Sequence, residues 1–382
     1  MKLRNISRIN MKLKKNKKYI VAVSGGPDSM YLLHNLVKKN FKNLVVCHVN
    51  HNYRVDSIHD QLLVEDYCKK NNILFYVKNI YYETKNKNFE SWARNERYSF
   101  LKEILIKEEA DAILTGHNKN DHIETYLLQT QKNKMVKFYG IKNKTHINNC
   151  LILRPILNLK KSTIIKKMNK FNLLYAIDTT NYDTKYSRNK IRKNLSESSF
   201  KYYEKLIYIE NKEVDKYNKT ILKLLPKQKK YFDLNTFTKD NDFNLRYFFK
   251  YVEENYRVTE ILKSKKARLK EIIRQLSSDK SYINISINSF NIIKDYNRVY
   301  IVKNSTVEVF ESFSKPQGFE WTQNEKTNLI YTNNWVKWQS KLYYNKKRLK
   351  DFYMNKKFSY LKRFKTILVF DPVDKVILNK IC

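Results

Sequence analysis

Apolar residues in the first part of the chain gather in short runs, separated by segments with helical periodicity. Continuous apolar runs predict buried strands at residues 19–23, 44–49, 73–77 and 111–116. After a glycine turn, Met30, Leu33 and Val37 fall on one helical face, and we expect further helices at 57–70, 89–109 and 120–131. This alternation over short connections predicts a parallel sheet covered on both faces, with ligands bound beyond the carboxyl ends of its strands.

The pattern changes after residue 131. Residues 131–149 are rich in Lys and Asn and predict a mobile loop, whereas 151–157 returns to the sheet or its edge and 160–172 predicts a helix. Residues 206–276 are helix-like and strongly basic, with a hinge near Pro226, and alternation at 282–302 indicates a small sheet. We therefore predict an α/β chain with a parallel-sheet domain at 1–205, a basic and mostly helical domain at 206–305, and a small mixed α/β domain at 306–382.

The chain is strongly basic. Its 382 residues include 76 Lys and Arg against 37 Asp and Glu, a formal net charge of +39. Codon drift in an AT-rich genome would explain many lysines, but it does not explain why acidic residues are so few. A charge of this size favours a polyanionic partner such as a nucleic acid.

Cysteine usage and hydropathy indicate where the protein works. The four cysteines, Cys47, Cys68, Cys150 and Cys382, form neither a C-x-x-C pair nor a cluster with zinc-ligand spacing. So few scattered cysteines indicate a reducing compartment. The basic N-terminus has no apolar core of signal-peptide length, and no stretch approaches the roughly 18 apolar residues that cross a bilayer. We expect a cytoplasmic protein with no membrane partner.

The clearest chemical signal is Ser24-Gly25-Gly26-Pro27-Asp28-Ser29, between the first strand and the first helix. It lacks Walker spacing, but two glycines let backbone N–H groups turn toward a phosphate, and the helix N-terminus adds partial positive charge. The hydroxyls of Ser24 and Ser29 can also donate to phosphate oxygens. Asp28 would repel a phosphate, so we expect it to hold Mg²⁺ or to cap the helix.

This loop resembles the SGGxDS loop of the N-type ATP pyrophosphatases, the PP-loop superfamily. Within that superfamily, the tRNA(Ile)-lysidine synthetases are similar in segments running from His48 to Arg54 (HVNHNYR), Leu114 to Thr125, Arg154 to Leu157 and Asp178 to Arg192. One predicted helix resembles the family's E-x-x-A-R-x-x-R-Y-x-x-F pattern in Glu90, Ala93, Arg94, Arg97, Tyr98 and Phe100. Here only one residue separates Tyr98 from Phe100. The resemblance is dense over residues 20–192 and weaker over 340–372.

The resemblance implies a ligase that uses ATP to adenylate O2 of the wobble cytidine in the isoleucine tRNA with a CAU anticodon. Free L-lysine then displaces AMP, and codon reading changes from AUG to AUA. The implied partners are this tRNA, free L-lysine, ATP and Mg²⁺, and a homodimer stays open. The basic residues 206–382 would then bind tRNA.

The implied site residues fall into four groups. ATP binding is assigned to Ser24, Gly25, Gly26, Pro27, Asp28, Ser29, His48 and Asn50. Catalysis is assigned to Asp28, Arg94, His117, Asp121 and Glu124, and Mg²⁺ binding to Asp28 and Asp121. Binding of tRNA is assigned to Arg97, Arg188 and Arg192.

The spacing of His117, Asp121 and Glu124 agrees with these roles. At i, i+4 and i+7, they are predicted to project from one face of a helix start. Lysine's ammonium needs carboxylates to hold it and a base to take its proton, and Asp121 and Glu124 suit both needs. Asn120, where the family usually has Asp, removes one negative charge, and His122 stands where Gln is common.

Plainer alternatives stay open. Arg94 and Arg97 suit phosphate, but also ion pairs with Glu90 or Glu96. His48 and His51 line the nucleotide pocket or are structural. The chain could also be a tRNA thiolase, with Cys150 as its candidate nucleophile, or a non-catalytic RNA-binding protein, against which the intact loop speaks.

Overall fold

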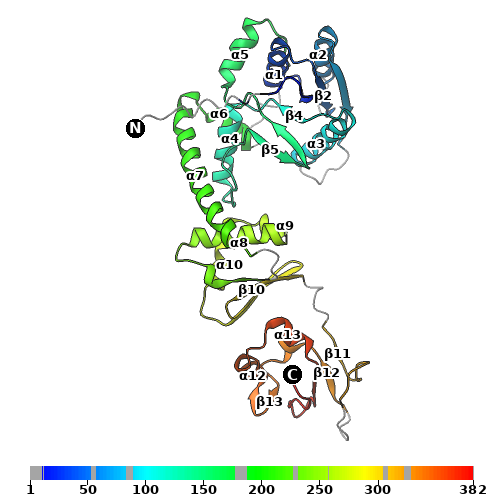
Figure 1. Cartoon of the computed structure of the whole chain (residues 1–382), viewed down its shortest axis with the longest axis vertical. Coiled ribbons are helices and arrows are strands. Elements are labelled where there is room, and N and C mark those ends of the chain that lie inside the picture. Colours follow the sequence, from blue (N-terminus) through cyan, green and yellow to red (C-terminus); the bar gives the residue numbers. More distant parts are fainter. Residues whose placement is uncertain are drawn as a thin grey trace. The chain divides into compact units, whose positions relative to one another are not determined.

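The computed structural model describes residues 11, 13–52, 57–82, 89–176, 187–226, 231–256, 258–303, 309–321 and 328–381. The chain divides into two compact units, Met1–Lys216 and Tyr217–Cys382 (Figure 1). The three domains predicted at 1–205, 206–305 and 306–382 stay predictions.

The first unit is built on a sheet of six described strands in the order β3-β2-β1-β4-β6-β5. The strands are β1 (Tyr19–Ala22), β2 (Leu44–Asn50), β3 (Leu74–Asn79), β4 (Ala112–Thr115), β5 (Lys144–Ile147) and β6 (Cys150–Leu153). All neighbours pair in parallel except β5, which is antiparallel to β6. The predicted α/β class and parallel sheet are confirmed.

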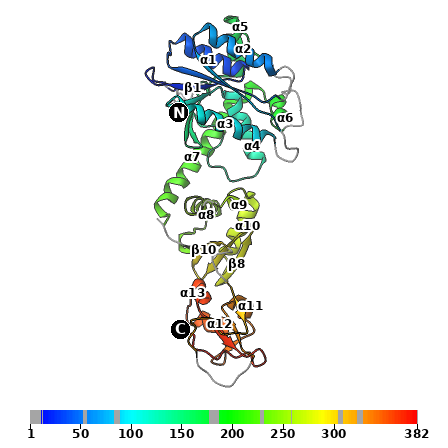
Figure 2. The ribbon, with the colours of Figure 1, turned by 90° about the vertical axis from the view of Figure 1, so that its right-hand side faces the viewer.

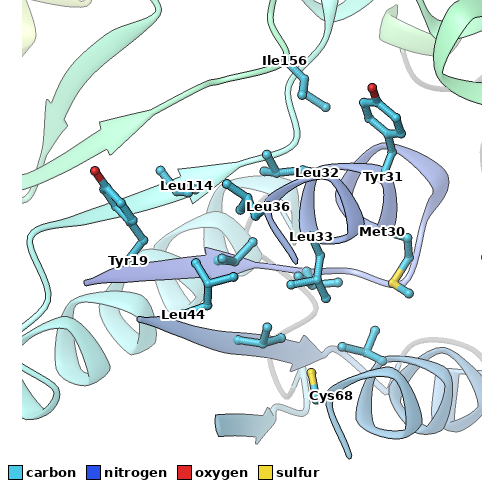
Figure 3. Close-up of a cluster of buried hydrophobic side chains, with 14 of the residues drawn as sticks. Tyr19, Met30, Tyr31, Leu32, Leu33, Leu36, Leu44, Cys68, Leu114 and Ile156 are labelled. Atoms are coloured by element: carbon cyan, nitrogen blue, oxygen red, sulfur yellow. The ribbon is translucent and has the colours of Figure 1, made fainter. Parts of the chain in front are cut away.

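Helices cover both faces of this sheet, as Figure 2 shows for α1 and α2 on one side and α3 on the other. The described helices of the chain up to residue 224 are α1 (Pro27–Lys38), α2 (Ser57–Lys70), α3 (Phe89–Lys107), α4 (Lys119–Gln131), α5 (Lys161–Lys170), α6 (Ser187–Asn194) and α7 (Phe200–Leu224), with a 3₁₀ turn η2 (Glu197–Ser199). The last residues of α7, from Tyr217, belong to the second unit. Because successive strand residues point to opposite faces, Leu114 and Leu44 pack with Leu33 of α1 (Figure 3), while Ile20 and Ile113 pack with α3. The short apolar runs of the sequence are therefore strands buried on both sides.

The prediction that residues 131–149 form a mobile loop is wrong. Residues 144–147 form β5, and Asn148 and Asn149, with φ of 50° and 65°, make a two-residue turn into β6. Upstream of β5, the side chain of Gln129 accepts a hydrogen bond from the Gly140 N–H over 2.7 Å and donates one to the Phe138 carbonyl over 3.1 Å. The polar composition hid this strand because an edge strand needs few apolar residues.

In the second unit, three helices accompany a sheet of four described strands in the order β7-β10-β9-β8. These elements are β7 (Tyr231–Asp233), η3 (Leu234–Thr236), α8 (Asn241–Asn255), α9 (Thr259–Leu262), α10 (Lys266–Leu276), β8 (Tyr282–Ile287), β9 (Phe290–Asp295) and β10 (Arg298–Lys303). The sheet predicted at 282–302 is confirmed. The helix-like reading of 206–276 missed β7, whose buried Phe232 packs edge-on against Tyr251 of α8.

The C-terminal part of this unit shares a core with that sheet. Its elements are β11 (Glu311–Ser312), β12 (Ile330–Thr332), α11 (Trp335–Trp338), β13 (Tyr343–Tyr344), β14 (Lys347–Arg348), α12 (Leu349–Asn355), α13 (Tyr360–Lys365) and β15 (Leu368–Phe370). Trp335, which has no exposed surface, belongs to one apolar cluster with Ile293 of β9 and Tyr300 of β10. Within the described ranges, no helix has the length and apolar character to cross a membrane.

Candidate active site

The loop after β1 adopts a backbone conformation that requires a glycine. Gly25 has a φ of +84°, in the left-handed region, and a Cβ there would lie 3.3 Å from both Cβ and O of Asp60. The buried Ser29 hydroxyl accepts a hydrogen bond from the Ser24 N–H over 3.2 Å and donates one to the Gly26 carbonyl over 3.0 Å. The Ser29 side chain thus stabilises the loop, whereas Ser24 is exposed and is available to a phosphate.

Asp28 lies in the first turn of α1 and faces two other helix starts. Its Oδ1 accepts a hydrogen bond from the Asn118 side-chain amide over 2.9 Å, and its Oδ2 lies 2.5 Å from the Lys161 ammonium. The alternative that Asp28 caps α1 is wrong, because the cap residue is Gly26 and it makes no side-chain cap bond. The Asp28 carboxylate therefore points across the site toward α4 and α5.

Asn118 caps α4 and was missed by the sequence analysis. Its side chain accepts the Asp121 N–H over 3.0 Å, while its own N–H donates to Asp121 Oδ2 over 2.9 Å. This reciprocal capping box, an Asn followed three residues later by Asp, was the available signal. Because α4 begins at Lys119, His117 precedes the helix, and the prediction that it projects from a helical face with Asp121 and Glu124 is wrong.

Gly116, in the connection between β4 and α4, packs closely against the phosphate loop. A Cβ at Gly116 would lie 3.0 Å from both N and Cα of Ser29. Only a residue without a side chain allows this approach, so Gly116 brings the start of α4 next to the start of α1.

Glu124 is buried, and its carboxylate is held by α6. Arg192 donates from Nε to Oε1 over 2.9 Å and from Nη2 to Oε2 over 3.1 Å, while Arg188 Nε donates to Oε2 over 3.2 Å. Both guanidinium groups also approach Asp121 Oδ1, at 3.8 and 3.9 Å. Two of the three arginines predicted to bind tRNA, Arg188 and Arg192, thus pair with predicted catalytic carboxylates, although 40% and 42% of their side-chain surfaces stay exposed. Their contact with tRNA stays a prediction.

The electrostatic field of the site is positive around His117. Its Nδ1 lies 2.8 Å from Thr115 Oγ1. Burial lowers the pKa of His117 to about 3, and four guanidinium groups lower it further, those of Arg154, Arg188, Arg94 and Arg97. His117 is therefore neutral at pH 7 and is poorly suited to store a proton.

Asp121 shows the opposite shift. Burial raises the pKa of Asp121, and the negative charges of Glu124 and Asp28 raise it further, against the hydrogen bond from the Asn118 backbone and the charge of Arg188. Asp121 and Asp28 belong to one site, since both carboxylates accept hydrogen bonds from Asn118. A raised pKa suits Asp121 to accept a proton.

His48 and Asn50, at the carboxyl end of β2, make structural contacts. His48 is buried with Nδ1 2.9 Å from the Val23 carbonyl, and burial lowers its pKa. The Asn50 side chain donates to the Ser57 carbonyl and to Gln61, both over 3.3 Å. Their contact with ATP stays a prediction, as do the roles of Tyr53, Arg54 and residues 178–181, which lie outside the described residues.

Arg94 and Arg97 of α3 do not form the ion pair with Glu96 that was the alternative to phosphate binding. Arg94 lies over the Tyr98 ring at 4.9 Å, and Arg97 Nη2 lies 3.4 Å from His51 Nε2. Glu96 pairs with Lys78 at 3.4 Å, and the side chain of Glu90 lies outside the description. Burial and the Arg97 charge hold the pKa of His51 at about 4, so this exposed arginine faces a neutral imidazole.

The unusual Asn120 has a structural reason. Its Oδ1 accepts the Lys161 N–H over 2.9 Å, which caps α5, and its Nδ2 donates to Glu197 Oε1 over 3.4 Å. A carboxylate could make only the first of these contacts and would repel Glu197. Neither Lys161 nor Glu197 was singled out from the sequence.

The donor set near the loop fits Mg²⁺ bound together with a nucleotide. In the part of the chain that the structure describes, no group of three or more His, Cys, Asp or Glu could hold a metal ion. Asp28 and Asp121 are both hydrogen-bonded to Asn118, and Mg²⁺ is commonly held by one or two carboxylates plus substrate phosphates. These residues therefore suit a cation that arrives with ATP.

The described cysteines do not suit sulfur transfer. Cys47, Cys68 and Cys150 are all buried, and burial raises the pKa of each thiol. The candidate nucleophile of a thiolase, Cys150, is only 4% exposed and donates toward the Asn148 carbonyl over 3.7 Å. A buried thiol of raised pKa is a poor nucleophile.

Known proteins resemble this chain over its whole length. The PP-loop domain family matches residues 2–199. The tRNA(Ile)-lysidine synthase of Mycoplasma mycoides subsp. mycoides is 36% identical over 392 residues, which cover 97% of this chain and 98% of that protein. The tRNA(Ile)-lysidine synthase of Mesoplasma florum is 36% identical over 393 residues, which cover 97% and 99%.

A likeness to a solved structure is weaker. The U34-tRNA thiolase NcsA of Methanococcus maripaludis covers 53% of this chain and 76% of its own, with 19% identity and a TM-score of 0.44, too low to bear on function. The full-length likeness and the PP-loop match decide the family. This chain belongs to the PP-loop family, among the tRNA(Ile)-lysidine synthases.

Proposed function

We propose that this protein is an ATP-dependent ligase that joins free L-lysine to the wobble cytidine of the isoleucine tRNA with a CAU anticodon. In the first step, O2 of the cytidine attacks the α-phosphorus of ATP and pyrophosphate leaves. In the second, the ε-amine of lysine attacks the adenylated cytidine at C2, loses a proton, and AMP leaves. The product reads AUA in place of AUG.

The observation that carries this proposal is the hydrogen bonding of one buried residue, Asn118, to both Asp28 of the phosphate loop and Asp121 of α4. It puts an acidic pair beside the backbone N–H groups of the loop at residues 24–29 and the N-terminus of α1, which attract phosphate. Asp28 and Asp121 would hold Mg²⁺, which neutralises phosphate charge when bound.

The carboxylates of α4 support the lysine step. As the alternative to holding Mg²⁺, Asp121, whose pKa is raised by burial, is the candidate acceptor for the ammonium proton. Glu124 is charge-paired with Arg188 and Arg192, so its role is to position those guanidinium groups around Asp121. Arg94, Arg97 and the positive field around His117 suit the phosphates of ATP and the anticodon loop.

The positive charge of the whole chain supports binding of tRNA. The formal net charge of +39 favours contacts with the tRNA backbone, which give affinity but little sequence information. Choice of the isoleucine tRNA therefore needs further contacts with bases or with the shape of the anticodon loop.

The test is transfer of radiolabelled lysine, with ATP and Mg²⁺, to the isoleucine tRNA with a CAU anticodon. The initiator methionine tRNA is the matched control, because it carries the same anticodon. We expect label in the isoleucine tRNA only, and loss of that label in Asp28→Ala.

Two results would overturn the proposal in different ways. Release of pyrophosphate with tRNA but without lysine transfer would keep an ATP-using enzyme and remove the lysine assignment. No pyrophosphate with any tRNA tested would instead support a non-catalytic RNA-binding protein.

A further inference from the structure

Lys161 occupies a position where a lysine is electrostatically unfavourable. It is the first residue of α5, a helix with no acidic residue in its first turn and no side-chain cap from Lys160. The N-terminus of a helix carries partial positive charge and disfavours a nearby cation. A lysine at this position needs an anionic partner, and in this structure that partner is Asp28, 2.5 Å from the Lys161 ammonium.

Packing fixes the backbone of Lys161 beside the phosphate loop. Ile164 and Met168 of α5 are fully buried in one cluster with Leu32 of α1, and the Lys167 ammonium donates to the Tyr31 hydroxyl over 3.1 Å. The Lys161 side chain itself is 37% exposed, so its four-carbon chain can change conformation while the helix stays in place.

Three helix N-termini meet at this point. Asp28 lies in the first turn of α1, Asn118 caps α4, and Lys161 begins α5, and hydrogen bonds connect all three side chains. Three converging positive helix ends and one adaptable ammonium form a site for a multiply charged anion. Without such an anion, the carboxylate of Asp28 is the group that compensates the charge.

We propose that Lys161 is a phosphate-binding residue, and that its ammonium moves from Asp28 to the β and γ phosphates of ATP. This inference rests on the proposed function only in taking ATP as the substrate. When the bond between the α-phosphorus and the bridging oxygen breaks, the electron pair leaves with pyrophosphate, and the ammonium stabilises that charge. The same movement frees an oxygen of Asp28.

The first experiment compares two nucleotides that differ only beyond the α-phosphate, AMP and α,β-methylene-ATP, by titration calorimetry without tRNA or lysine. In Lys161→Gln, we expect affinity for α,β-methylene-ATP to fall by about tenfold or more and affinity for AMP to change by less than about twofold. Lys170→Gln, an exposed lysine in the last turn of the same helix, is the matched control and should bind both as wild type does. Equal losses for both nucleotides, or no loss for either, would overturn the proposal.

A second experiment uses the wild-type chain, so it does not depend on the folding of a variant. Lysines are acetylated by acetic anhydride, and the extent at Lys161 and Lys170 is measured by mass spectrometry. We expect α,β-methylene-ATP, but not AMP, to protect Lys161, with Lys170 unchanged. Lys161 acetylated to the same extent with either nucleotide would refute the phosphate contact. Both experiments omit lysine and tRNA, so their failure is distinct from failure of the lysine-transfer assay.

Discussion

The side-chain amide of Asn118 donates a hydrogen bond of 2.9 Å to Asp28, a residue 90 positions earlier in the chain. Asn118 is 3% exposed and also closes the capping box of α4 with Asp121. One side chain thus fixes the start of a helix and orients a carboxylate of the phosphate loop. These two duties can be separated by substitution.

Asn118→Ala removes both duties, whereas Asn118→Asp keeps the cap and loses the amide donor. We expect the alanine variant to lose about 1–2 kcal/mol in free energy of unfolding, from the cap and the buried hydrogen bond. The aspartate variant keeps the cap but buries a carboxylate against Asp28, so we expect it to lose stability as well. Its ATP-dependent pyrophosphate release should fall by more than this loss of stability explains. Urea unfolding and pyrophosphate release measure the two effects. Wild-type pyrophosphate release by Asn118→Asp would show that the amide donor is dispensable.

His117 makes the stability of the protein depend on pH. Its pKa is about 3 in the folded chain, against an ordinary value of 6.5. Below pH 6.5 the unfolded chain therefore binds a proton that the folded chain does not, and stability is lost as the pH falls toward 3. The loss approaches 1.4 kcal/mol per pH unit as a rough upper limit. Asp121, with its raised pKa, acts in the opposite direction.

His117→Asn should make the free energy of unfolding depend less on pH. Between pH 7 and pH 5, urea unfolding of His117→Asn should lose stability less steeply than wild type, by up to about 1 kcal/mol per pH unit. His146→Asn is the control, because that side chain on β5 is exposed and meets solvent in both states. Parallel curves for wild type and His117→Asn would mean that folding does not lower the pKa of His117.

Substitutions at Asn120 and Glu197 should have coupled effects on the free energy of unfolding. In Asn120→Asp, the new carboxylate would still cap α5 through the Lys161 N–H, but it would face Glu197 Oε1 at the 3.4 Å now bridged by the amide. We expect a loss of roughly 0.5–1 kcal/mol in free energy of unfolding, recovered when Glu197→Gln is added. A double-mutant cycle by urea unfolding measures the coupling. Additive effects of the two substitutions would show that the departure from the family's Asp has another cause.

Features that depend on residues close together in the chain can be predicted from the sequence. The parallel strands follow from short apolar runs, and the phosphate loop from glycines placed between a strand and a helix. The pairing of Glu124 with Arg192 and of Asp28 with Lys161 joins residues 68 and 133 positions apart, and no local pattern marks either pair. Arg188 and Arg192 were therefore predicted only as tRNA-binding residues, whereas the fold turns their guanidinium groups onto the buried carboxylate of Glu124. Strand β5 was missed for a different reason, since its signal was the Asn148-Asn149 turn and not hydrophobicity.

The second unit contains a buried ion pair between β9 and α13. Arg363 Nη2 lies 3.3 Å from Asp295 Oδ1, and the two side chains are 4% and 3% exposed. Asp295 Oδ2 also accepts the Tyr360 N–H over 2.7 Å, and the Arg363 guanidinium lies 4.8 Å from the Trp335 ring. The pair joins the small sheet to the C-terminal helices, so its loss should destabilise both.

Asp295→Asn keeps an acceptor for the Tyr360 N–H but leaves the Arg363 charge buried without its counter-charge. We expect it to cost about 3–5 kcal/mol in free energy of unfolding, because a buried charge that loses its partner is poorly solvated. Adding Arg363→Met should recover part of that loss, since no buried charge of the pair then remains. Glu311→Gln, at an exposed pair with Lys337, is the control and should cost about 1 kcal/mol or less. Urea unfolding followed by tryptophan fluorescence suits this unit, which holds Trp321, Trp335 and Trp338. A double variant less stable than Asp295→Asn would show that Arg363 stabilises this core by its stacking on Trp335 and not by its charge.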